Sequence, residues 1–174
     1  MPACIEAVRL DATIGVTAAL PDDAVRQLGA PERVELLIEP IDDRQLRLML
    51  VIRNKPANRM PEASFLTFTP SGAVDWRHRK MGAWLDPLRT APRGGGQLQA
   101  VEAVSARLAN GRCTVTPLDS PLVAPADWPF MSFNPAPPIL DAGIRFNLHN
   151  NKWGTNFPMW WGGDFAARFV IEVD

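Results

Sequence analysis

The chain has 174 residues, 47% of them hydrophobic, which is enough for one globular domain with a sizeable core. Its formal net charge of −1 and the lack of any block of like charge argue against nucleic acid or a charged membrane surface as a partner. No stretch approaches the roughly 20 apolar residues that span a bilayer. The first residues lack a secretory signal pattern, so a cytoplasmic location is expected for the chain as it stands.

The first predicted element is a short helix over residues 21–29, with Asp22 as its N-cap and Gly29 as its stop. An apolar run at 34–38 and an alternating segment at 44–53 then predict the two strands of a hairpin. In the second strand one face is apolar and the other is mixed; the apolar face holds Leu46, Leu48, Leu50 and Ile52.

Further strands are predicted in the middle and at the end of the chain. Residues 64–69 form one strand, which the turn sequence at 70–72 ends. Residues 97–108 and 112–118 form a hairpin around Asn110-Gly111, and because of that turn a strand is preferred to a helix at 101–108. The last strands lie at 144–148 and 165–173, and in the final one Val170 and Glu172 are expected to face away from Phe169, Ile171 and Val173.

The many short strands and turn signals predict an all-β fold. We expect an antiparallel β-sandwich with long Pro/Gly-rich loops and at most one short helix. The long stretches at 55–63, 82–96 and 119–141 are predicted to be irregular. The chain is expected to be a single domain over residues 1–174, with a weak boundary near residue 60 as the alternative.

Metal-binding residue types are few. The two histidines and two cysteines show no ligand spacing, so no metal and no cofactor are expected. Cys4 and Cys113 are predicted to be buried free thiols. His78, which lies among basic residues, is predicted in a solvated loop, and His149 is expected to bond to loop backbone.

Hydrolysis of a sugar would need two carboxylates. The sequence selects no pair, and the candidate catalytic residues are Glu62, Asp119 and Asp164. Glu62 also lies near Arg59, which predicts an ion pair that pins a loop. Neither a Gly-x-Ser-x-Gly nucleophile motif nor a nucleotide-binding fingerprint occurs.

The most distinctive segment is 147–164, which holds three of the six tryptophans among amides and glycines. Indole faces beside amide donors suit a sugar ring, but the same side chains can close one end of a sandwich. Adjacent Trp160 and Trp161 point to opposite faces if extended, so one should face outward as a carbohydrate platform or as a contact with another domain or subunit. The candidate ligand-binding residues are His149, Asn150, Asn151, Trp153, Asn156, Trp160 and Trp161.

Five blocks, in order along the chain, resemble a known family. They are 59–68, Gly82 with Leu85-Asp86-Pro87, 97–101, 118–123 (Leu-Asp-Ser-Pro-Leu-Val) and 147–160, with its Asn-Asn-Lys-Trp-Gly-Thr-Asn-Phe sequence. Together they resemble the C-terminal β-sandwich region of bacterial proteins similar to glycoside hydrolase family 38, the α-mannosidase-like enzymes. The resemblance covers about residues 45–174. The chain departs from it at Gln99, where a histidine is expected.

The resemblance implies a non-catalytic role. In that family the catalytic zinc, its ligands and the nucleophile belong to an N-terminal α/β barrel that these 174 residues do not contain, so no catalytic residue is carried over. The implied partner is such a catalytic barrel domain or subunit, with carbohydrate as a further possible partner. Two alternatives stay open: a free-standing carbohydrate-active enzyme, with carboxyl groups about 5–10 Å apart in one cleft, and a homo-oligomeric binding or assembly module.

Overall fold

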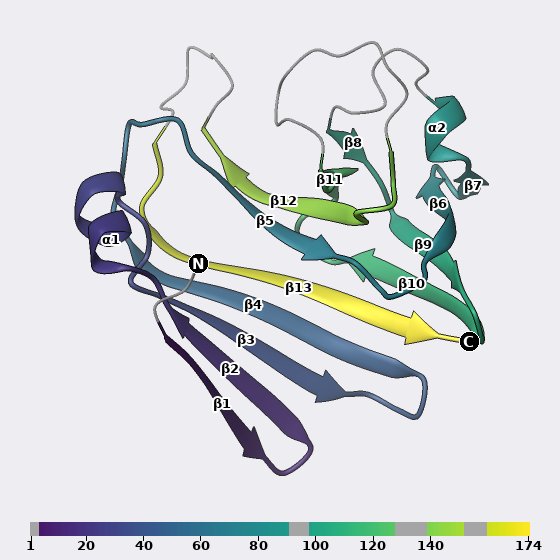
Figure 1. Cartoon of the computed structure of the whole chain (residues 1–174), viewed down its shortest axis with the longest axis horizontal. Coiled ribbons are helices and arrows are strands. Elements are labelled where there is room, and N and C mark those ends of the chain that lie inside the picture. Colours follow the sequence, from purple (N-terminus) through teal and green to yellow (C-terminus); the bar gives the residue numbers. More distant parts are fainter. Residues whose placement is uncertain (1–3, 91–97, 128–138, 152–159) are drawn as a thin grey trace.

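The computed structural model describes residues 4–90, 98–127, 139–151 and 160–174. In these residues the chain folds into two antiparallel sheets that pack together, which confirms the predicted all-β sandwich (Figure 1). The strand order is β1-β2-β3-β4-β13-β10-β9-β6-β7 in the larger sheet and β5-β12-β11-β8 in the smaller one.

The strands of the larger sheet are β1 (Cys4–Leu10), β2 (Thr13–Ala19), β3 (Arg33–Pro40), β4 (Gln45–Lys55), β6 (Val74–Lys80), β7 (Ala83–Leu85), β9 (Ala103–Leu108), β10 (Gly111–Pro117) and β13 (Gly163–Val173). Those of the smaller sheet are β5 (Ala63–Phe68), β8 (Gln99–Ala100), β11 (Leu122–Pro125) and β12 (Ile144–Asn150). The helices are α1 (Asp22–Leu28) and the four-residue α2 (Pro87–Thr90), so the described chain has one short helix more than expected. No helix in the described part of the chain is long and apolar enough to cross a membrane.

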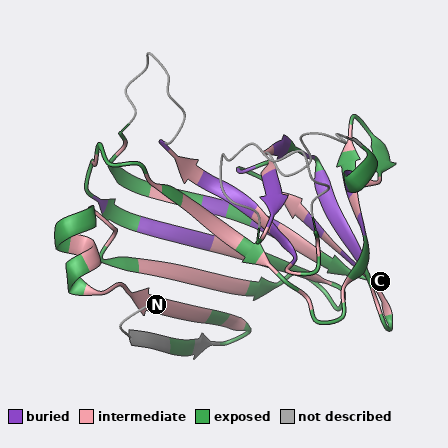
Figure 2. Cartoon of the chain, turned by 45° about the horizontal axis from the view of Figure 1, so that its top comes forward, coloured by how far each residue is buried: buried purple, intermediate pink, exposed green. Residues whose placement is uncertain are grey.

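The core lies between the two sheets and is built from alternate strand residues. Phe169 of β13 and Phe146 of β12 are almost fully buried, and their rings meet edge to face with centroids 5.1 Å apart. As predicted, Leu50 and Ile52 of β4 face this core. Figure 2 shows the buried segments concentrated where the smaller sheet covers the larger one, whereas no residue of β2 is buried.

The predicted hairpins are confirmed, and their turns show why. β9 and β10 pair antiparallel around Asn110-Gly111, where Gly111 has a φ of 148°. β3 and β4 pair in the same way. Helix α1 ends at Gly29, whose left-handed φ of 65° stops it as expected. Its N-cap is Pro21 rather than Asp22, because Asp22 already lies in the helix, and no side chain caps this end.

Three other expectations were wrong. The strand predicted at 97–108 divides between the sheets: the Val101 N–H bonds to Pro121 on the smaller sheet's side, and the Glu102 N–H bonds to Arg79 of β6. The stretches at 82–96 and 119–141 are not wholly irregular, since β7, α2 and β11 lie within them. His78 lies in strand β6 with 4% of its surface exposed, not in a solvated loop. The thiol of Cys113 is free and buried, as predicted, whereas the side chain of Cys4 lies outside the part of the chain whose side chains are described.

Candidate functional site

Several of the candidate residues meet at one end of the sandwich, beside α1. There β4 ends at Lys55, β5 begins at Ala63, β12 ends at Asn150 and β13 begins at Gly163 (Figure 1). This arrangement brings Glu62, His149 and Trp161 together around Lys55, although they are far apart in the sequence.

Lys55 is the centre of this cluster. Its side chain is only 3% exposed, and its Nζ lies 2.6 Å from Glu62 Oε1. The same ammonium donates to the backbone carbonyls of Pro56 at 3.0 Å and of Trp161 at 3.3 Å. The ammonium therefore has a carboxylate counter-ion and two carbonyl acceptors, which offset the cost of burying its charge. Glu62 thus pins the loop before β5, but its partner is Lys55 rather than the expected Arg59.

A β-bulge explains how a lysine came to be buried. The pairing of β4 with β13 shifts register between Gly163 and Phe165, and Asn54 takes a φ of 51°. Simple alternation from Ile52, which faces the core, would point Lys55 outward; the extra residue of the bulge reverses it. Asp164 fixes this geometry, because its Oδ1 accepts the Asn54 N–H at 2.9 Å.

His149 and Trp161 form the aromatic part of the cluster. Their ring centroids are 5.3 Å apart, and the Trp161 indole also packs edge-on against Phe165 at 5.9 Å. Burial lowers the pKa of His149; the nearby Glu62 carboxylate opposes this effect and Lys55 adds to it. His149 Nδ1 lies 4.0 Å from Glu62 Oε1, which is beyond hydrogen-bonding distance.

The amide side chains of Asn150 and Asn151 are used within the chain. Asn151 Oδ1 accepts the Glu62 N–H at 2.6 Å, and its Nδ2 donates to the carbonyls of Met60 at 2.8 Å and Asn58 at 3.3 Å. Asn150 Nδ2 donates to Asn147 Oδ1 at 2.7 Å. These bonds hold the loop before β5 against the end of β12 and leave few of these amide donors for a ligand.

The other two candidate carboxylates also face cations. Asp119 accepts three hydrogen bonds from Arg168: from its backbone N–H at 2.8 Å, from Nε at 2.9 Å and from Nη2 at 2.8 Å. These bonds, the guanidinium ones first, lower the pKa of Asp119. Asp164 Oδ2 lies 3.7 Å from Arg53 Nη1. A general acid of a glycosidase needs a raised pKa instead.

Trp160 faces outward beside this cluster. It is 41% exposed, and the Arg59 guanidinium carbon lies 4.1 Å from the centroid of its ring. Trp161 packs inward, so the two adjacent tryptophans do take opposite orientations. The candidates Trp153 and Asn156 lie outside the described residues.

A cavity of about 470 Å³ opens next to the cluster, between α1, β3, β4 and the start of β5. Its wall is mostly apolar, with Lys55 and Glu62 as its charged members. At its rim Leu28 is 53% exposed and Met60 is 51% exposed. The size is within the range of small-molecule sites, roughly 300–1,000 Å³.

Lys55 is the main site residue that the sequence does not reveal, because nothing at positions 54–55 predicts the bulge. Among the described residues, His, Cys, Asp and Glu form no group of three that could hold a metal ion. The described residues thus form a β-sandwich whose end beside α1 carries a partly open, mostly apolar cavity. Comparison of the chain with protein-family models and with curated proteins finds no match.

Proposed function

We propose that the chain is a non-catalytic β-sandwich module of a glycosidase-like protein, which supports a catalytic domain or contacts a glycan through the end that carries Trp160. One observation carries the proposal: at this end the Asn150 and Asn151 amide donors are engaged within the chain, while Leu28 and Met60 are exposed at the rim of a cavity and Trp160 is exposed nearby, over Arg59. Exposed apolar surface of this kind marks binding sites.

The state of the carboxylates supports binding rather than turnover. Glu62, Asp119 and Asp164 each have a lysine or arginine partner. Asp119 is held in its ionised form by Arg168. None of these arrangements resembles a protonated acid poised beside a second carboxylate. Purified chain is therefore expected to show no hydrolysis of mannosides or other glycosides.

Calorimetric titration with a panel of mono- and oligosaccharides, mannosides included, tests the glycan form of the proposal. Trp160→Ala should weaken binding about tenfold, since an aromatic contact contributes on the order of 1 kcal/mol. Trp84→Ala is the matched control, because Trp84 is 46% exposed on β7 at the other end of the sandwich. Equal affinities in both variants would contradict the assignment to Trp160.

If no glycan binds, the other half of the proposal, that the chain supports a catalytic domain, is tested next. It predicts that an α-mannosidase-like barrel protein encoded beside this chain co-purifies with the wild type and is lost with Trp160→Ala. Failure of both experiments overturns the proposal.

A homo-oligomeric module is the second candidate, and exposed apolar residues on β2 and β4 favour it. Ile14 of β2 is 43% exposed and Leu46 of β4 is 37% exposed. Both lie on the sheet face that continues the core, because Ile14 pairs with Ile38, Ile38 with Leu48, and Leu46 is two residues from Leu48. Light scattering after size exclusion would give twice the 19.2 kDa chain mass for a dimer.

A further inference from the structure

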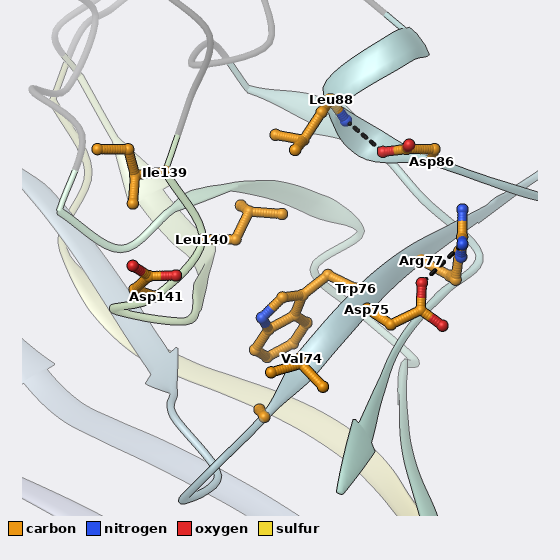
Figure 3. Close-up of a pocket in the computed structure, with 10 residues that line it drawn as sticks. Val74, Asp75, Trp76, Arg77, Asp86, Leu88, Ile139, Leu140 and Asp141 are labelled. Carbon is orange, nitrogen blue, oxygen red and sulfur yellow. Dashed lines mark hydrogen bonds and ion pairs between the residues drawn. The ribbon is translucent and has the colours of Figure 1, made fainter.

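A second cavity, of about 440 Å³, lies at the opposite end of the sandwich, between β6, α2 and the segment that leads into β12 (Figure 3). Val74, Leu88, Ile139 and Leu140 form its apolar wall. Leu88 is 42% and Ile139 58% exposed, so the cavity is open at this side. It shares no residue with the cavity next to Lys55.

Strand β6 places an indole donor in the wall of this cavity. The pairing of β6 with β9 shifts register between Val74 and Arg77, and Asp75 takes a φ of 52°, so the strand bulges here. Trp76 points inward and is 7% exposed. Its Nε1–H is buried and has no hydrogen-bond partner among the residues that the structure describes.

Such an unpartnered donor is unusual, since buried polar groups are nearly always bonded. In Figure 3 the indole nitrogen points toward the side of the cavity where Leu140 and Asp141 lie. A ligand oxygen at this position would accept the missing hydrogen bond.

The charges of the wall are mainly negative. Asp75 is neutralised, because Arg77 Nη2 lies 2.6 Å from its Oδ1 and Arg112 Nη2 lies 3.3 Å from its Oδ2. Asp86 and Asp141 add two further carboxylates. Asp86 Oδ1 accepts the Leu88 N–H at 2.9 Å at the start of α2. Asp141 is exposed at the rim, and no cation of the described chain pairs with it.

We propose that this cavity binds a small organic amine that also carries a hydroxyl or carbonyl oxygen. The oxygen accepts the Trp76 Nε1–H, the ammonium group donates to Asp141, and the carbon skeleton lies against Leu88 and Leu140. The excess of carboxylates repels an anion, and a neutral polyol lacks the charge that these carboxylates favour. The inference is independent of the proposed function, because it requires neither Trp160 nor a glycosidase-like partner.

Calorimetric titration of the full chain at pH 6.5 with glucosamine, glucose and glucuronate tests this proposal. Glucosamine and glucose differ only in an ammonium group that replaces a hydroxyl. We expect glucosamine to bind at least about tenfold more tightly than glucose, because charge-assisted hydrogen bonds are roughly twice as strong as neutral ones. Glucuronate should not bind. In a ¹H–¹⁵N spectrum the Trp76 indole signal, assigned from its absence in Trp76→Phe, should shift on addition of glucosamine.

Two substitutions locate the site. Asp141→Asn should abolish the preference for glucosamine over glucose, whereas Asp43→Asn, at an exposed position before β4, should leave it unchanged. Asp141 is exposed, so this variant is expected to fold even if Trp76→Phe does not. Equal binding of glucose and glucosamine, a preference that survives Asp141→Asn, or the absence of both heat and an indole shift would overturn the proposal.

Discussion

His78 is a buried titratable side chain in β6. Burial and the nearby Lys80 lower its pKa to about 4, although the Gln99 side chain beside it favours the charged form. In the unfolded chain the imidazole has its ordinary pKa of 6.5. Between pH 6.5 and 4 the unfolded state therefore binds more protons than the native state, so the folded chain loses stability as the pH falls through this window.

The loss should be about 3 kcal/mol at most, since one pKa unit corresponds to about 1.4 kcal/mol. His78→Gln removes the titrating group, so its free energy of unfolding should depend less on pH. Urea denaturation of both proteins near pH 7 and near pH 4.5 measures the difference, and other titrating groups cancel in the comparison. If the two proteins lose the same stability, His78 does not control this pH dependence.

Individual buried polar residues were the hardest feature to predict. His78 has basic neighbours, which suggested a solvated loop, yet alternation alone places Trp76 and His78 on the same side of a strand. That signal was present in the sequence. For Lys55 no such signal exists, because its burial depends on a bulge formed with a strand more than a hundred residues later. The opposite orientations of Trp160 and Trp161, by contrast, followed from the alternation of side chains along an extended backbone.

Elements with a local cause were predicted well. The β9–β10 hairpin follows from Asn110-Gly111, and the end of α1 follows from Gly29. The strands β1, β2 and β6 were not predicted. β1 and β2 lack a strong apolar alternation. They form because β1 pairs with β2, β2 pairs with β3, and β3 pairs with β4. Tertiary context of this kind overrides weak local preference.

The turn at Gly111 gives a prediction about these elements. A Cβ at this position would overlap the backbone carbonyl of Asp174, and the φ of 148° disfavours any side chain. Arg112 and Asp174 exchange backbone hydrogen bonds of 2.9 and 3.1 Å here, so Gly111→Ala would force β10 away from the end of β13. We expect a loss of about 3 kcal/mol or more in the free energy of unfolding.

Gly72→Ala is the matched control. Gly72 has a φ of 68°, but a Cβ there would meet no atom within 4 Å. Only the cost of a left-handed backbone remains, about 1–2 kcal/mol. Chemical denaturation of the two variants compares them directly. Similar losses would mean that the close approach of Asp174 does not constrain position 111.

At the scale of the whole molecule, stability should decrease from the centre of the larger sheet toward β1. Core residues of β4, β9, β10 and β13 pack against the smaller sheet. By contrast, β2 has no buried residue, and Val8 of β1 is 57% exposed. Amides of β1 and β2 should therefore exchange with solvent roughly 100-fold faster than those of β4 and β13, because local opening there breaks few apolar contacts.

Hydrogen exchange followed by mass spectrometry or NMR at two protein concentrations measures this gradient and separates the monomer from the homo-oligomer. In a monomer the fast exchange of β1 and β2 is independent of concentration. If a second copy covers Ile14 and the neighbouring apolar residues, protection of β2 rises with concentration, since association stabilises the folded state by mass action. Strong protection of β1 and β2 at every concentration, in a chain that light scattering shows to be monomeric, would contradict the expected gradient. β2 would then not be the part of the sandwich that opens most easily.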